Sequence, residues 1–244
     1  AGSSHAAGAD GGTLDMSGGN HHGSGTGGDV SLVSGTSSDG TGGSLFVSVG
    51  DSAGQAAGGA LEIHAGLSQD DSSSHAGGAI DINAGKATSG DGGSVSIAAG
   101  RSALGDGGDV EIAGGLGTTS SSGSIFILTR DTESSAGVSG EISVSTGSAM
   151  SGTSGNLDLR TGTALGGASG DVQLSVGSGT SGDGGALSLL GGKVTGTEVG
   201  AGGGISVVSG SSDNGVGGSV SVTSGASNNG PGGDVTISVG VANG

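Results

Sequence analysis

The sequence predicts an all-β fold, a single-chain β-solenoid (parallel β-helix-like) of about 15 coils with 15–19 residues per coil, a thin cross-section and no helix. The first observation behind this prediction is a repeated motif, Gly-Gly-x-Φ-x-Φ-x-x-Gly, in which Φ is Val, Ile or Leu. The second is that its apolar positions alternate with a polar one, and the third is a content of 64 Gly, which opposes helix formation. We number each copy of the motif from its first residue. The copies start at residues 11, 27, 42, 58, 77, 92, 107, 122, 139, 154, 169, 184, 202, 217 and 232.

Positions 4 and 6 of each copy are the predicted core. They are apolar in all fifteen copies, and position 5 between them is polar in thirteen, which is the pattern of a strand with one buried face. If each copy is one coil, equal positions of successive coils stack as parallel strands at about 4.8 Å and form a buried ladder. The predicted core ladder contains Val30, Leu32, Ile80, Ile82, Val95, Ile97, Val110, Ile112, Val220, Val222, Val235 and Ile237.

The remaining positions complete the predicted coil. Small residues at positions 8 and 11 are expected to face inward, and the glycines at positions 1, 2, 9 and 14 are expected to form corners with positive φ or tight bends. Longer steps, such as the one that contains 66–76, are interpreted as insertions at one corner that preserve the register. A bundle of polyproline-II helices would need Gly at every third residue, which this spacing does not provide.

Residues 1–244 are predicted to form one continuous array. Gly2 resembles the end of a preceding copy, and 241–244 resemble the start of a further polar loop. The array is therefore expected to be a segment of a longer one.

The composition excludes some classes of function. The net charge is −17 with only five Lys and Arg residues, so a nucleic-acid partner is not expected. No run of about 18 apolar residues is present, so no membrane span is predicted.

Candidate chemical sites are weak. Asp29, Asp109, Asp171 and Asp234 share position 3, but copies with other residues separate them, and no copy has the Gly-x-Asp spacing of calcium-binding β-rolls. We interpret these carboxylates as solvated charges, with weak divalent-cation binding as the alternative. The five His residues have no ligand-like spacing, and no Ser, His and Asp recur at matching offsets. No catalytic residue, metal site or cofactor is predicted, and the chain is not expected to be an enzyme.

Outward apolar residues are the candidates for contact with another chain. Phe46 and Phe126 occupy position 5, which is polar in the other thirteen copies, and four larger aliphatic residues occupy the outward position 7. Lateral association and incidental exposure are both open. The candidate lateral-association residues are Phe46, Phe126, Val33, Leu128, Leu190 and Val208.

The copies Gly-Gly-Asp-Val-Thr-Ile (232–237) and Gly-Asp-Gly-Gly-Ser-Val-Ser-Ile-Ala-Ala-Gly (90–100) resemble the Gly/Ser/Val tandem repeats of secreted proteins of diatoms and other microalgae. This resemblance implies an extracellular, wall- or surface-associated structural protein and carries no catalytic residue with it. The expected function is a structural rod in an extracellular fibre, appendage or cell-surface matrix, which assembles end to end or laterally with itself or with other matrix proteins.

Two alternative functions remain. The coil length is similar to that of the ice-binding solenoids of insects and grasses, whose active faces look like regular ranks of Thr or small polar residues. Acidic residues such as Asp81 and Glu111 interrupt the corresponding outward face here, so ice binding ranks second. An adhesin-type stalk ranks third, because no rank of aromatic residues is present.

Overall fold

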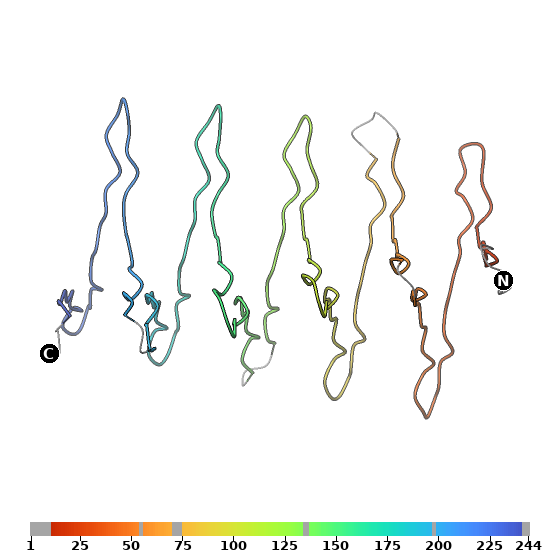
Figure 1. Cartoon of the computed structure of the whole chain (residues 1–244), viewed down its shortest axis with the longest axis horizontal. Coiled ribbons are helices and arrows are strands. Elements are labelled where there is room, and N and C mark those ends of the chain that lie inside the picture. The colour runs from red at the N-terminus through yellow and green to blue at the C-terminus, as the bar shows by residue number, and fades with distance from the viewer. Residues whose placement is uncertain (1–10, 54–55, 70–74, 134–136, 197–198, 241–244) are drawn as a thin grey trace. The chain divides into compact units, whose positions relative to one another are not determined.

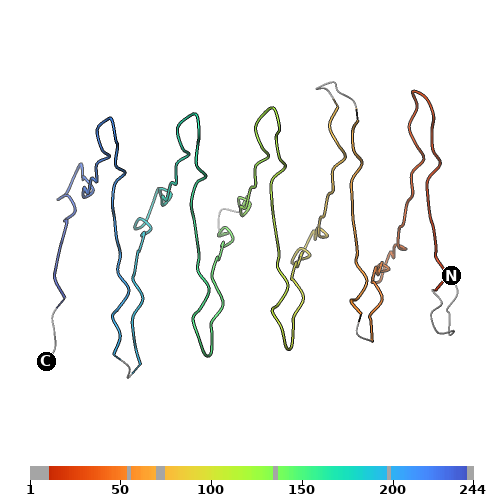
Figure 2. The same cartoon turned by 45° about the horizontal axis from the view of Figure 1, so that its top comes forward.

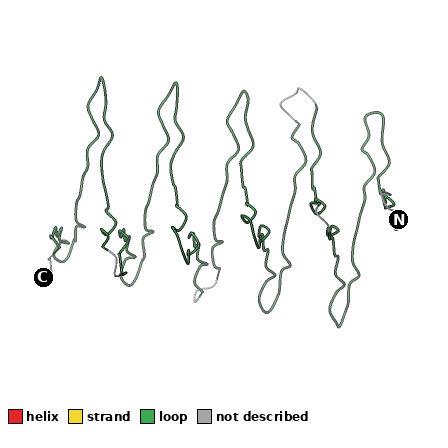
Figure 3. Ribbon diagram, viewed as in Figure 1, coloured by secondary structure: helices red, strands yellow, loops and turns green. Residues whose placement is uncertain are grey.

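Extended arms that alternate with polar loops make up the chain in its computed structural model (Figure 1). The structure describes residues 11–53, 56–69, 75–133, 137–196 and 199–240. These residues contain no helix and no strand, and Figure 3 accordingly draws them as loop throughout. An arm corresponds to positions 1–9 of a copy, and a loop connects position 9 to the first two residues of the next copy.

The bends of the chain lie in its loops. They are at residues 23–25, 38–40, 56, 88–90, 103–105, 118–120, 150–152, 165–167, 180–182, 196, 213–215 and 228–230, all between position 9 of one copy and position 1 of the next. At several of these loops the chain turns back on itself, as both orientations show (Figures 1 and 2).

The predicted β-solenoid is wrong for the part of the chain that the structure describes. A solenoid needs continuous parallel pairing between equal positions of successive copies. Here no strand pairing is present, and the backbone hydrogen bonds between copies are isolated bonds that join the two sides of a loop. The alternation at positions 4 to 6 was compatible with a strand, but glycine makes ordering of the backbone costly, and two medium aliphatic residues per copy give little burial in return.

One backbone hydrogen bond recurs at the base of the loops. The N–H of the position-2 glycine donates to the carbonyl of the position-9 glycine of the preceding copy, and we call this the closing bond. It is 2.8–2.9 Å long at nine loops and 3.4 Å at Gly59. The donors are Gly28, Gly43, Gly59, Gly78, Gly93, Gly108, Gly123, Gly203, Gly218 and Gly233.

Insertions are accommodated inside the closed loops. Gly43 bonds to Gly35 across a standard loop, whereas Gly78 bonds to Gly66 across the longest step in the sequence, with the same 2.8 Å distance. The extra residues of this step therefore lie between the two glycines of the closing bond and not at a solenoid corner, and residues 70–74 among them are outside the described residues.

The chain divides into two units, Ala1–Ile125 and Phe126–Gly244. Within the first unit, each loop from Gly28 to Gly123 has a closing bond. Within the second unit, the described glycines Gly140, Gly155, Gly170 and Gly185 have no closing bond, and the bond returns at Gly203. Closing bonds are therefore present at every loop from Gly28 to Gly123 in the first unit but only from Gly203 onward in the second.

No hydrophobic side chain among the described residues is buried. The predicted core ladder is consequently wrong as well: Val95 is 54% exposed and Ile97 is 73% exposed, and the other members are similar. In each arm of this ladder the position-4 residue is less exposed than the position-6 residue. The uncovered members are Val30, Leu32, Ile80, Ile82, Val95, Ile97, Val110, Ile112, Val220, Val222, Val235 and Ile237.

Candidate association surface and loops

The side chain at position 8 determines whether a loop has a short closing bond. Where this residue is Gly, Ala or Ser, as at Ala84 and Ser224, the bond is 2.8–2.9 Å long. Where it is Val49, the bond lengthens to 3.4 Å. The structure gives no closing bond to the four described loops that follow a β-branched residue at Thr129, Thr146, Thr161 and Val176.

The physical reason is the space beside the next position-2 glycine. A Cβ built on Gly59 would lie 2.5 Å from Cγ1 of Val49, and one built on Gly185 would lie 2.8 Å from Cγ1 of Val176. The valine side chain therefore occupies the space beside the glycine at these two loops, whereas a Cβ on Gly155 or Gly170 would lie 3.7–3.9 Å from Thr146 or Thr161, at ordinary contact distance. Ala84 has no γ carbon, so the backbones approach closely enough for Gly93 to donate to Gly85 at 2.9 Å. The expectation that position 8 faces a solenoid interior is replaced by this contact across the loop.

Position 11 does not face an interior either. At Ser37, Ser102, Ser212 and Ser227 the hydroxyl oxygen accepts a hydrogen bond of 2.8–2.9 Å from the N–H of the position-14 glycine three residues later. These serines are exposed and act within their own loops. Such local side-chain to backbone bonds are typical of serine in turns.

Three loops without serine at position 11 use a different geometry. Gly90, Gly152 and Gly182 have φ of 108°, 114° and 76°, and they are the position-14 glycines of loops with Ala or Gly at position 11. Of the two predicted alternatives, positive φ is found at position 14 in three loops and at no described glycine of positions 1, 2 and 9. At position 2 the alternative of a tight bend applies, because a Cβ on Gly28 or Gly203 would lie 2.9–3.0 Å from a backbone nitrogen across the loop.

The aliphatic rows at positions 4 and 6 form the candidate association surface. The chain exposes 23608 Å², whereas a folded monomer of 21.8 kDa exposes roughly 9,300 Å². In the described copies these rows repeat at the spacing of the motif and lie open to solvent. A surface of this kind favours contact with other apolar groups.

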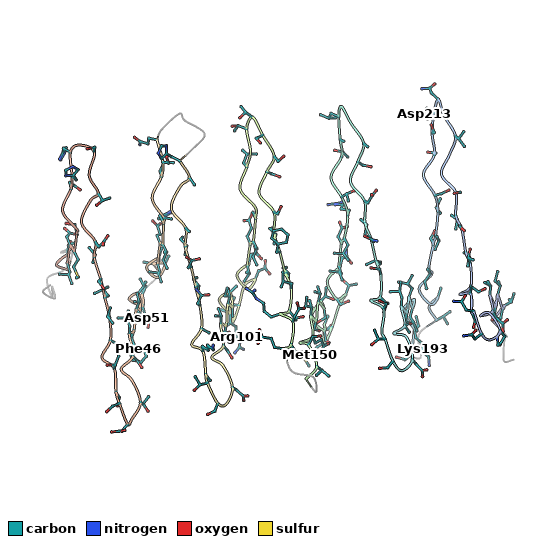
Figure 4. All side chains as sticks on the ribbon, turned by 180° about the vertical axis from the view of Figure 1, so that it is seen from behind. Phe46, Asp51, Arg101, Met150, Lys193 and Asp213 are labelled. Carbon is teal, nitrogen blue, oxygen red and sulfur yellow. The ribbon has the colours of Figure 1, made fainter. Side chains whose placement is uncertain are left out.

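The candidate lateral-association residues are all exposed. Phe46 is 88% and Phe126 is 82% exposed, and Figure 4 shows Phe46 on an arm near the loop that contains Asp51. Phe46 belongs to the first unit and Phe126 is the first residue of the second. Their exposure leaves lateral association as a prediction. The aliphatic members, also exposed, are Val33, Leu128, Leu190 and Val208.

Charged residues also lie at the surface. Glu62 and His64 approach to 3.6 Å, and Asp158 and Arg160 to 3.2 Å, in each case between positions 5 and 7 of one arm. Residues two apart thus share one side of an arm, as expected for extended backbone. Both pairs are exposed, so their contribution to stability is small.

The described residues contain no arrangement suited to a ligand. Within the described ranges no group of three or more His, Asp or Glu side chains is placed to hold a metal ion, and no pocket is present. His5 lies outside these ranges. Asp29, Asp109, Asp171 and Asp234 are exposed and belong to separate copies.

The sequence matches no protein-family model, and no curated protein or solved structure matches it. Among the described residues, no helix is long and apolar enough to cross a membrane.

Proposed function

We propose that this chain is a structural component of an extracellular fibre or cell-surface matrix, in which it associates with further copies of itself. The observation that carries the proposal is the uncovered aliphatic surface, which recurs in the described copies at positions 4 and 6. A repeated contact surface of this kind suits an assembly in which many weak contacts act together.

The available area supports association between copies. The exposed surface exceeds that of a folded monomer of this mass by roughly 14,000 Å², and a stable protein interface needs only about 1,600 Å² in total. A second chain presents its aliphatic residues at positions 4 and 6 with the same spacing. Contact at one arm therefore aligns the neighbouring arms of the two chains. Burial of apolar surface is worth about 25 cal/mol per Å², which makes this surface the main source of association energy.

Charge regulates this association. Each chain has a net charge of −17, and the like charges on two chains repel each other. The Debye length falls from about 30 Å at 0.01 M salt to about 8 Å at 0.15 M salt. Assembly is therefore expected to need salt, as an extracellular medium provides.

Sedimentation velocity and electron microscopy of one preparation at both salt concentrations test the proposal. We expect dispersed monomers at 0.01 M salt and larger, extended particles at 0.15 M salt. Monomers at every salt and protein concentration would contradict it. Ice shaping by such dispersed monomers would favour the ice-binding alternative instead.

The two phenylalanines provide a variant with a matched control. Replacement of Phe46 and Phe126 by Ser removes two exposed rings and is expected to raise the protein concentration needed for assembly severalfold. The control replaces Ser96 and Ser143, which occupy position 5 in other copies, by Ala and should assemble as the unchanged chain does. Equal assembly of the two variants would exclude a role for Phe46 and Phe126 in lateral contact.

A further inference from the structure

Two loops place an asparagine directly before a glycine whose N–H is held by a serine. In one loop the N–H of Gly215 donates to Oγ of Ser212 at 2.9 Å, and in the other the N–H of Gly230 donates to Oγ of Ser227 at 2.9 Å. Asn214 and Asn229 are the residues before these glycines, and both are exposed.

We propose that Asn214 and Asn229 are sites of spontaneous deamidation, and that the hydroxyls of Ser212 and Ser227 slow the reaction by holding the attacking nitrogen. This inference is independent of the proposed function. It concerns a covalent modification that depends on the local structure of two loops.

The reaction begins at the backbone nitrogen of the glycine. After loss of its proton to solvent base, the nitrogen of Gly215 attacks Cγ of Asn214 and forms a carbon–nitrogen bond. The bond from Cγ to the side-chain nitrogen breaks, ammonia leaves, and a five-membered succinimide remains. Water then opens the ring at either carbonyl, giving aspartate or isoaspartate. The net change is consumption of one water and release of one ammonia.

The sequence and exposure favour this reaction. Glycine has no Cβ, so it offers the least steric resistance to ring closure on the preceding side chain. Neither asparagine is covered by other groups, so water reaches both the nitrogen and the ring.

The serine opposes the reaction at its first step. While Oγ of Ser212 accepts the hydrogen bond, the proton of the Gly215 nitrogen is directed at the hydroxyl and is less available to solvent base. The bond also holds the loop in one conformation, which the chain must leave to bring the nitrogen to Cγ. The same argument applies to Ser227 and Gly230.

The product has consequences for the loop. Each conversion adds one negative charge, so modification of both residues changes the net charge from −17 to −19. Isoaspartate also inserts a methylene group into the main chain between the serine and the glycine. The hydrogen bond from the glycine N–H to the serine Oγ is then expected to be lost, because the longer main chain between the two residues changes their separation.

The test follows deamidation of the full chain at mildly alkaline pH by peptide mass spectrometry, with isoaspartate separated by chromatography. Ser212→Ala is expected to deamidate at Asn214 about fivefold faster, the factor that one net hydrogen bond supplies, while the rate at Asn229 in the same molecule stays unchanged. Ser227→Ala should show the reverse pattern. Ser212→Thr retains a hydroxyl and should keep the slow rate, and Ser211→Ala is the matched control for removal of a neighbouring hydroxyl.

Denaturant separates the hydrogen bond from an effect of sequence alone. In concentrated urea the rates of Ser212→Ala and the unchanged chain should converge, since the loop conformation is lost. Equal rates in native buffer would overturn the proposal. A rate difference that persists unchanged in urea would also overturn it, because the serine would then act without the structured loop.

Discussion

At the scale of single residues, the size of one side chain per copy decides the state of a loop. A position-8 residue that is not β-branched permits a short closing bond, as in the pair Gly85 and Gly93, whereas Val49 lengthens it and Thr146 accompanies its absence. The difference arises from one or two heavy atoms in the gap between the arms. The motif's tolerance of Gly, Ala, Ser, Thr or Val at this position therefore has a structural consequence.

Exchange of these side chains tests the rule. Thr146→Ala is expected to create a closing bond from the N–H of Gly155 to the carbonyl of Gly147, because it removes the γ atoms beside Gly155. Amide hydrogen exchange of Gly155 should slow about fivefold, as for a bond worth about 1 kcal/mol. The reciprocal control, Ala84→Thr, should accelerate exchange of Gly93. Unchanged exchange at both glycines would show that the position-8 side chain does not control formation of the closing bond.

At the scale of the loop, two local arrangements shape the bend. In one, a position-11 serine accepts a bond from the position-14 glycine, as Ser102 does from Gly105. In the other, the position-14 glycine has positive φ, as Gly90 does. Because serine supplies the hydrogen-bond acceptor in the first type, only the second requires a backbone conformation that other residues rarely adopt.

Alanine substitution at position 14 distinguishes the two loop types. Gly90→Ala places a Cβ on a backbone with φ of 108°, which costs about 1–2 kcal/mol, and should accelerate amide exchange at the nearby closing bond of Gly93. Gly105→Ala is the matched control, because its Cβ meets only Oγ of Ser102 at 3.4 Å and φ is not positive. Exchange at Gly108 should change much less. Equal effects at Gly93 and Gly108 would contradict the distinction.

At the scale of the whole molecule, the aliphatic residues do not form an interior in the described ranges. This separates the chain from ordinary folded domains, in which such residues provide most of the stability. It also explains why the surface available for association is so large. Any stability gained from the rows must come from contacts with other molecules.

Ile97→Asp tests whether the rows are uncovered in the monomer. Burial of an unpaired charge would cost several kcal/mol, but Ile97 is 73% exposed, so the variant is expected to change the monomer by less than about 0.5 kcal/mol. The closing bonds at Gly93 and Gly108, on either side of this arm, should keep their exchange rates at 0.01 M salt. Faster exchange at both glycines would indicate that Ile97 is covered.

The sequence by itself determined the repeat, its register and the positions of the loops. It also indicated that the longer steps lie in the loops, and it placed glycine at position 14, where three loops have positive φ, because these features depend on residues close together in the chain.

Only the tertiary structure decided whether successive copies of the motif pair with and cover one another. Periodicity predicts which residues share a side of an arm, but stacked strands and uncovered arms have the same alternation at positions 4 to 6. The roles of positions 8 and 11 were likewise hidden, because small size suits both an interior and a loop, and only the contacts of Val49 and Ser212 distinguish them. Local spacing therefore specified the loops, whereas coverage of the aliphatic rows depends on the balance between backbone entropy and burial, which no single copy reveals.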